Sequence, residues 1–130
     1  MRQGKPRRMH RIWLALGALA GLTAVGLAAW AAHGAPARLD AARLAMLANG
    51  LQMQGWHALA LLAAGLWADR RGGLLPQLAG AAFALGLIRF CGGVYAQAIG
   101  GVSLGPVAPT GGMVLMLGWA LLFVSAVWRR

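Results

Sequence analysis

Residues 12–32 read IWLALGALAGLTAVGLAAWAA, an unbroken apolar run of about 21 residues that no charged side chain interrupts. At 1.5 Å per residue, a helix of this length reaches roughly 31 Å, about the thickness of the hydrocarbon core of a bilayer. A basic segment precedes the run, as in a secretory signal, but the apolar region of such a signal is usually only about 7–15 residues long. We therefore expect an uncleaved membrane-spanning helix near the N-terminus.

Three more apolar runs follow the first. The sequence predicts an all-α integral membrane bundle of four transmembrane helices at about residues 12–33, 51–68, 74–99 and 109–128. Residues 12–130 would form a single membrane domain, preceded by a basic tail at 1–11. Composition agrees, because 60% of the 130 residues are hydrophobic and only 11% are charged, too few polar residues to cover the surface of a soluble domain.

The positively charged residues are sorted between the predicted connections. The tail holds five of the twelve Lys and Arg residues, two follow the second run and two close the chain, whereas the first connection holds two and the third none. An excess of cytoplasmic Lys and Arg is typical of membrane proteins. We expect both termini in the cytoplasm of a bacterial inner membrane. This sorting accounts for the net charge of +10, so we expect membrane lipids as partners and no nucleic acid.

The connection between the first two runs, residues 37–50, is less apolar than the runs themselves. Asp40 is a predicted N-cap of a short helix lying in the outer interface and leading into the second span. Asp69 to Gly73, a charged and glycine-rich stretch, predicts a tight cytoplasmic turn. Tryptophans are expected to form belts at the two interfaces, with Trp13, Trp67 and Trp128 on the cytoplasmic side and Trp30 and Trp56 on the outer side.

Small residues are expected where helices contact one another. Gly17 and Gly21 form a GxxxG pair on the first helix, and Gly111 and Gly112 lie at the start of the fourth. Glycines let helix backbones approach closely in a lipid environment, where the hydrophobic effect does not drive helices together. We favour packing within one bundle over a dedicated dimer contact.

Polar residues of the predicted spans gather in the outer half of the bundle. The candidate cluster, a site for a ligand or a partner, consists of His33, Gln54, His57, Arg89 and Tyr95. Arg89 is the costliest, because an arginine at the centre of a span costs about 2.5–3.5 kcal/mol on insertion scales. No acidic residue is expected within the membrane. The alternative partners of Arg89 are carbonyl groups, Gln54, Tyr95, water, a lipid phosphate, a bound anion or another subunit. A further alternative is that Arg89 snorkels, so that its charged end lies among the outer headgroups.

The histidines raise the question of a haem group, which helical bundles do hold between facing histidines. His33, however, is followed by Gly34, a pair typical of a helix C-terminus with a left-handed glycine cap. His57 is equally suited to an interhelical hydrogen bond. The carboxylates, Asp40 and Asp69, are expected at opposite faces of the membrane, and Cys91 is expected to be a packing residue. We predict no enzyme activity, no metal site and no cofactor.

Four short motifs resemble one known family. They are AWAAHG at 29–34, QGWHALALL at 54–62, FCGGVY at 90–95 and APTGG at 108–112, the last followed by Gly118-Trp119. In this order they resemble the domain-of-unknown-function 423 (DUF423) family of small four-helix inner-membrane proteins. The resemblance covers about residues 12–128. It implies no established activity, and it marks as motif positions His33, Gln54, His57, Gly92, Pro109, Gly111 and Gly112. Arg89 and Gly93 depart from the family pattern.

These observations leave several functions open. The first hypothesis is that the protein is an accessory or assembly subunit of a larger membrane complex, for example a respiratory complex. Its partners would be other membrane-protein subunits or a second copy of the chain. The alternative is a small-molecule binder that holds quinone, haem or an anionic lipid in the outer-half polar pocket. A transporter is less favoured, because no polar path continues through the inner half.

Overall fold

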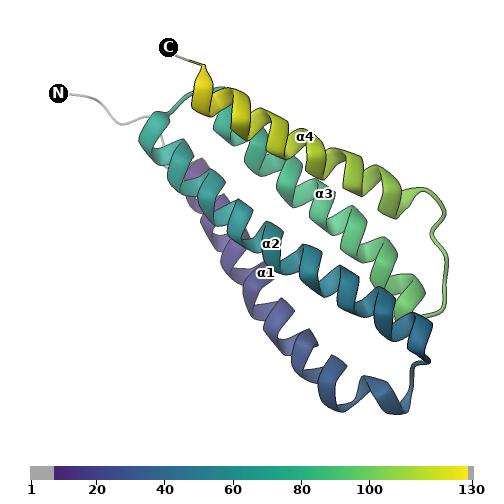
Figure 1. Cartoon of the computed structure of the whole chain (residues 1–130). Helices are drawn as coiled ribbons and strands as arrows, with labels where there is room; N and C mark the ends of the chain where they lie inside the picture. The colour runs from purple at the N-terminus through teal and green to yellow at the C-terminus, as the bar shows by residue number, and fades with distance from the viewer. Residues whose placement is uncertain (1–7, 129–130) are drawn as a thin grey trace.

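The structure, a computed structural model, describes residues 8–128, and every regular element in that range is helical. The elements are α1 (Arg8–His33), the short 3-10 helix η1 (Ala35–Ala37), α2 (Ala41–Arg71), α3 (Leu74–Ala98) and α4 (Val107–Val127) (Figure 1). The all-α prediction is therefore confirmed. Most of the predicted basic tail, together with the last two arginines, lies outside the described residues.

The second helix differs from the prediction. Asp40 is its N-cap as expected, since its carboxylate accepts a hydrogen bond from the Arg43 backbone N–H at 2.9 Å. The separate interfacial helix was wrong, because α2 continues unbroken for 31 residues and contains the predicted second run at 51–68. The helix does not break at Gly50, the last residue of the predicted connection 37–50. A Cβ there would lie 2.5 Å from Cε1 of Tyr95, so this glycine permits close packing on α3 within a continuous helix.

The continuity of α2 moves the residues that it carries. Gln54 and His57, expected in the outermost turns of a span, lie near the middle of α2. Trp56 also lies there and its side chain is 58% exposed, so it does not belong to an outer aromatic belt. Trp13 is near the expected end of α1, but it is buried and donates a hydrogen bond to Gln77 at 2.6 Å. The polar residues are thus not confined to the outer half.

The remaining boundaries are close to the expected ones. Helix α1 begins at Arg8, a turn earlier than predicted, and α4 begins at Val107 with Pro109 in its first turn, where proline is tolerated. The turn between α2 and α3 is formed by Gly72 and Gly73, both with positive φ (71° and 84°), which confirms the predicted tight turn.

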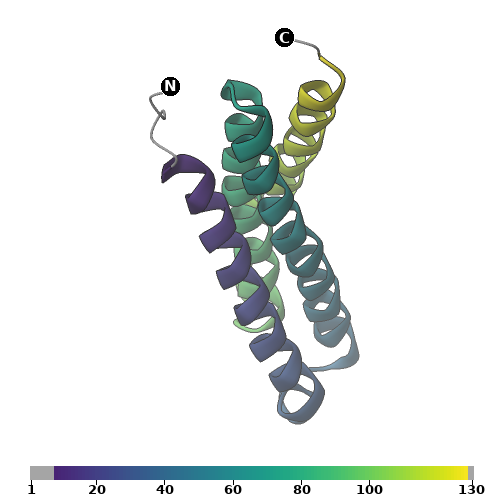
Figure 2. The same ribbon diagram turned by 90° about the vertical axis from the view of Figure 1, so that its left-hand side faces the viewer.

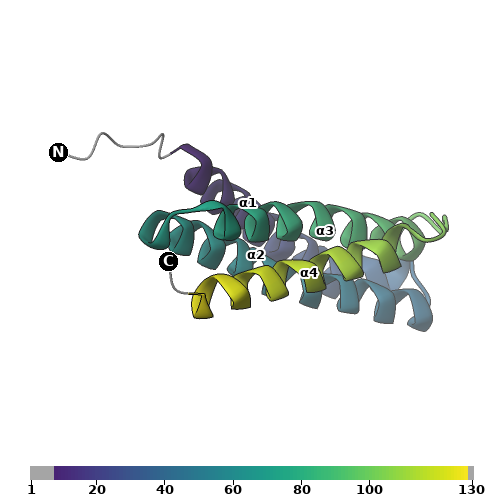
Figure 3. The ribbon, with the colours of Figure 1, turned by 90° about the horizontal axis from the view of Figure 1, so that it is seen from above.

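The helices do not form a closed bundle. α2 and α3 form a central antiparallel pair, α1 packs chiefly on α2, and α4 packs on α3. Figure 2 shows α1 and α4 on opposite sides of this pair. Seen from above, α4 runs alongside α3 (Figure 3). Both flanking helices therefore leave an apolar face uncovered, with exposed side chains such as Leu22 and Val25 on α1 and Met116 and Phe123 on α4.

Side-chain contacts identify the two ends of the molecule. At one end, His10 of α1 lies 3.6 Å from Asp69 of α2, and Arg71 donates to the carbonyl of Trp128, the residue after α4. At the other end, the Arg43 guanidinium donates to the last carbonyls of α3 at 2.7 and 2.8 Å. The start of α1 and the end of α4 thus lie at the same end (Figure 1), and α2 runs the whole length between the two ends.

The predicted glycine contacts are only partly confirmed. Gly17 packs on α2, where an added Cβ would lie 2.8 Å from the Ala58 carbonyl, and Gly111 packs against the α3 backbone. Gly21 faces open space, with nothing within 4 Å of an added Cβ, so the prediction that it packs was wrong within this chain, and Gly92, a motif position of the family resemblance, is equally open. Gly17 and Gly21 are four residues apart, but α1 crosses α2 so that only the first is covered.

Three helices of the described chain are long and apolar enough to cross a membrane, namely α1 from Met9 to His33, α3 and α4. Helix α2 does not meet the same criterion, because polar side chains are distributed along its length.

Candidate functional site

The structure does not place the five predicted site residues in one pocket. Gln54 and Tyr95 contact each other, whereas Arg89 contacts α4 and His57 contacts a different part of α4. His33 is exposed at the end of α1. The expected cluster therefore separates into one interhelical network, two individual contacts and one surface residue.

Gln54 is the centre of a polar network that joins three helices. Its Oε1 accepts a hydrogen bond from the Tyr95 hydroxyl of α3 at 2.7 Å. Its Nε2 donates to the Ala20 carbonyl at 2.9 Å and to the Thr23 hydroxyl at 2.8 Å, both on α1. Gln54 is buried, and unmade hydrogen bonds in hydrocarbon are costly, so this network fixes α1 and α3 relative to α2.

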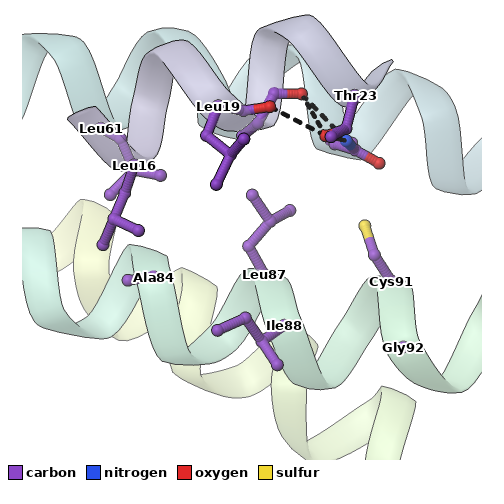
Figure 4. Close-up of a pocket in the computed structure, with 11 residues that line it drawn as sticks. Leu16, Leu19, Thr23, Leu61, Ala84, Leu87, Ile88, Cys91 and Gly92 are labelled. Carbon is purple, nitrogen blue, oxygen red and sulfur yellow. Dashed lines mark hydrogen bonds between the residues drawn. The ribbon is translucent and has the colours of Figure 1, made fainter. Parts of the chain in front are cut away.

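Beside this network, α1 and α3 diverge and leave a groove whose floor is α2. The groove has a volume of about 340 Å³. Its walls are almost entirely apolar, with Leu16 and Leu19 on α1 facing Ala84, Leu87 and Ile88 on α3 (Figure 4). Thr23 and Cys91 lie at one end, next to Gln54, and the open Gly92 forms part of the α3 wall. We call this cavity the α1–α3 groove.

His57 lies one turn after Gln54 on α2, and its ring packs against the aromatic rings of Phe83 and Trp119. Its Nδ1 lies 2.7 Å from the Met53 carbonyl, and its Nε2 lies 3.0 Å from the Trp119 indole nitrogen. An indole N–H only donates and a carbonyl only accepts, so His57 is neutral with the proton on Nδ1. The rings of Phe83 and Trp119 each have centroids 5.9 Å from that of His57. Both ring nitrogens of His57 are engaged in hydrogen bonds within the chain, and this arrangement does not favour His57 as an axial ligand of haem.

Arg89 extends towards α4. Its Nε and Nη2 donate to the Thr110 hydroxyl at 3.3 and 2.9 Å, and this hydroxyl in turn donates to the Val107 carbonyl at 2.9 Å. Gln54 and Tyr95, two of the partners considered for Arg89, are instead paired with each other. Cys91, two residues further along α3, faces α2, where its thiol lies 3.6 Å from the Gly50 carbonyl.

His33 ends α1 as predicted, but its glycine neighbour has another role than expected. Gly34 has φ −103° and ψ −39°, so it is not a left-handed cap. Its N–H donates to the Trp30 carbonyl at 2.8 Å, and an added Cβ would lie 2.7 Å from Cδ1 of the Trp30 ring. Glycine is therefore required here by the packing of the indole ring, because any side chain would displace it.

A family model described as "Protein of unknown function (DUF423)" matches residues 27–112, from the end of α1 into the start of α4. The chain belongs to the DUF423 family. The match contains Gln54, Tyr95, His57 and Arg89, whereas the Gln54 partners Ala20 and Thr23 precede it. No solved structure matches the chain.

Curated relatives of this DUF423 chain are named membrane proteins. A UPF0382 membrane protein of Bacillus subtilis, YwdK, is 32% identical over 119 residues, which cover 90% of this chain and 97% of the relative. A UPF0382 inner membrane protein of Escherichia coli K12, YgdD, is 31% identical over 90% of each chain. A UPF0382 membrane protein of Haemophilus influenzae is 34% identical over 88% of this chain and 92% of the relative. Together with the three apolar helices, these similarities show that the DUF423 chain is a membrane protein.

Several residues that position the polar side chains of this DUF423 chain escaped the sequence analysis. Thr23, Thr110 and Trp119 supply the partners of Gln54, Arg89 and His57. Arg43, predicted only as a charge of the first connection, binds the C-terminal carbonyls of α3. Each pairing joins residues of two different helices that are at least 21 positions apart, so no local spacing could have indicated it.

Proposed function

We propose that all four helices cross the bacterial inner membrane, with both termini in the cytoplasm. Three helices have the length and composition of spans, and α2 runs antiparallel to its neighbours between the same two ends. If α1 and α3 cross the bilayer in the same direction, α2 must return between them. The basic residues Arg70 and Arg71 lie at the end that holds the start of α1, which supports a cytoplasmic position for that end.

Within this topology, we propose that the protein is an accessory or assembly subunit of a larger membrane complex. The observation that carries the proposal is the open arrangement of the helices: the α1–α3 groove, with the open Gly92 in its wall, is not covered by another helix of the described chain. The polar groups inside the protein, by contrast, are consumed by contacts within the chain. Among residues 8–128, no buried side-chain nitrogen or oxygen lacks a hydrogen-bond partner. Such a molecule offers surface for association, and little that would move or convert a substrate.

The α1–α3 groove is the proposed contact, and its occupant is a transmembrane helix of another subunit. Its walls combine large side chains, such as Leu19 and Ile88, with the small residues Ala20, Ala84 and Gly92. Small residues allow the backbones of two helices to approach, and close packing is a main source of helix association in lipid. The surface around the groove is apolar, which suits a partner helix within the bilayer and no charged extramembrane domain.

The test is to extract the protein from its native membrane in mild detergent and to determine the mass and composition of the particle. We expect a stoichiometric foreign subunit. The variant Gly92→Leu, which fills the groove, should lose that subunit. Gly21→Leu is the matched control, because it adds the same side chain at an open glycine of α1 that does not line the groove.

Two results would contradict the proposal. A monomer or homo-oligomer extracted from native membranes would exclude a foreign partner. Equal retention of the subunit by both leucine variants would exclude the groove as the contact. A photoreactive residue at Leu19 should also cross-link to the partner, whereas one at Met116, on the uncovered face of α4, should not.

A second candidate function, binding of a small molecule, is favoured by the polar end of the same groove. A ligand with an apolar chain and a polar head, such as a quinone or a lipid, would place its head near Thr23 and Gln54. Haem is less suited, because His33 lies at the end of α1 while His57 is engaged by Trp119. Extraction of bound lipids and quinones from the purified protein, followed by mass spectrometry, tests this candidate.

We propose no catalytic activity and no cofactor of the protein's own. The nucleophile and base candidates are spread over different helices. Cys91 contacts the Gly50 carbonyl and His57 contacts Met53 and Trp119, so they do not form a nucleophile–base pair.

A further inference from the structure

Arg89 carries a charge for which the chain has no acidic counterpart. The sequence holds two acidic residues, Asp40 and Asp69. The first caps the start of α2, and the second is in the last turn of α2, 3.6 Å from His10. Neither lies near the part of α3 that contains Arg89. An arginine within a membrane protein is costly unless its charge meets water, a headgroup or an anion, so this residue needs a partner from outside the chain.

The depth of Arg89 follows from its contacts with α4. Helix α4 begins beside Gly93, where an added Cβ would lie 2.8 Å from the Cβ of Ala108. Arg89 precedes Gly93 by one helical turn of α3 and so lies one turn further from the loop that joins α3 to α4. The Arg89 guanidinium donates hydrogen bonds to Thr110, in the first turn of α4. Gly111 of α4 lies beside Arg89, since an added Cβ at this glycine would lie 2.9 Å from the Cβ of Arg89, and Thr110 is one residue nearer the start of α4. The guanidinium therefore lies close to the level at which α4 begins.

The loop before α4 marks where the hydrocarbon ends on this side. Residues 99–106 have no helical backbone apart from turns, and 100–106 are exposed. Gly101, Val102 and Gly105 donate backbone hydrogen bonds within the chain, but an exposed backbone that is otherwise unpaired does not occur in the hydrocarbon region, because its remaining N–H and C=O groups would be unsatisfied. The loop must therefore lie at headgroup level or beyond. Arg89, about one turn below it, is within reach of the phosphates of the outer leaflet.

We propose that Arg89, held by Thr110, binds the phosphate of an outer-leaflet phospholipid. The Thr110 hydroxyl orients the guanidinium through Nε and Nη2, and Nη1 makes no hydrogen bond to the described residues. A guanidinium with free donors is well suited to phosphate, which it can bind through two parallel charge-assisted hydrogen bonds. Threonine acts here as a positioning residue, because its oxygen fixes the plane of the donor group.

The surface below Arg89 fits the remainder of a phospholipid. Leu85 lies one turn below it on α3, and Met113 lies one turn beyond Thr110 on α4; both are more than half exposed. The acyl chains would run along these side chains. This surface belongs to α3 and α4, and Arg89 does not line the α1–α3 groove. The lipid site is therefore independent of the proposed subunit contact.

The experiment measures lipid retention by native mass spectrometry. The whole protein is reconstituted in nanodiscs of phosphatidylethanolamine and phosphatidylglycerol, transferred to detergent and washed with detergent alone. We expect about one phospholipid per wild-type chain, with retention at least tenfold weaker in Arg89→Gln, the loss expected when a charge-assisted hydrogen bond is removed. Arg89→Lys, which keeps the charge but loses the planar donors, should lie between the two. Arg38→Gln is the matched control, because Arg38 is an exposed cation of the outer connection.

Each contrary outcome overturns the proposal. Equal retention by Arg89→Gln would show that the arginine does not bind the lipid. Displacement of the lipid by millimolar inorganic phosphate would indicate a site for free anions, and a foreign protein retained through Arg89 would indicate an acidic partner. If Arg89→Gln does not fold, a dipolar coupling between the wild-type guanidinium carbon and lipid phosphorus in vesicles decides the question: its presence supports the site and its absence excludes it.

Discussion

Gly111 and Gly112 are neighbours on α4, yet the same substitution should have opposite effects at the two positions. A Cβ at Gly111 would meet the backbone of α3: it would overlap the Phe90 nitrogen and lie 2.9 Å from the carbonyl carbon of Arg89. A Cβ at Gly112 would lie 3.7 Å from the Phe90 ring, an ordinary van der Waals contact. We predict that Gly111→Ala destabilises the protein and that Gly112→Ala does not.

The expected magnitude follows from two contributions. Replacing glycine by alanine within a helix stabilises it by about 1 kcal/mol, and this gain is common to both variants. Overpacking costs typically about 1–3 kcal/mol, and the upper value applies at Gly111 because backbone atoms cannot rotate away as a side chain can. Gly111→Ala should therefore lower the free energy of unfolding by about 2 kcal/mol, while Gly112→Ala should raise it by up to about 1 kcal/mol. Their difference, about 3 kcal/mol, isolates the steric cost.

The free energy of unfolding would be measured by titrating the protein in mild detergent with sodium dodecyl sulfate, following helix content by circular dichroism. Gly118→Ala provides an intermediate case, because its Cβ would lie 2.7 Å from Cδ1 of Phe83, a side-chain atom and not a backbone atom. Equal stability of the Gly111 and Gly112 variants within about 0.5 kcal/mol would refute the close approach of α3 and α4 at this point.

Three further predictions concern the polar contacts and the topology. Trp119→Phe should lower the free energy of unfolding by about 1–3 kcal/mol in the same titration, because it leaves the buried Nε2 of His57 without its donor. Trp56→Phe is the control and should change the free energy of unfolding little, because Trp56 is exposed. Tyr95→Phe should cost less, about 0.6–1.7 kcal/mol, the range for interhelical hydrogen bonds in membranes. In intact cells a membrane-impermeant maleimide should label Ser103→Cys, and should label Asp69→Cys only after permeabilisation; the reverse pattern would invert the topology.

The sequence was sufficient to predict the helical fold, because the length and composition of apolar runs reflect the bilayer directly. It was insufficient for α2, whose first ten residues contain Arg43 and Asn49 and therefore resembled an interfacial segment. In the structure Arg43 is engaged by the end of α3, a contact 55 residues away along the chain. Tertiary contact thus compensates for the polarity that made this segment look separate from the span.

The glycines show a similar limit. The GxxxG pattern correctly indicated that Gly17 contacts another helix, but the same pattern included Gly21, which faces open space. Spacing places both residues on roughly one face of α1, whereas the crossing of two helices covers only a limited length of that face. Gly34 was predicted to be a left-handed helix cap, but its actual role is to admit the Trp30 ring, as Gly50 admits Tyr95. A glycine required for packing and one required for a turn look alike in sequence.

Residue type and spacing alone did not predict how the polar side chains of the candidate site are distributed among the helices. Gln54 and His57 are three residues apart on α2, so they were expected to share a pocket, but Gln54 points to α1 and α3 while His57 contacts Trp119 of α4. A central helix has neighbours on both sides, and each neighbour supplies a different partner. Satisfied polar groups of this kind join the helices and leave no free functional group. Arg89 differs, because its threonine partner offers no countercharge, and it is therefore the residue from which a function of the outer surface is best sought.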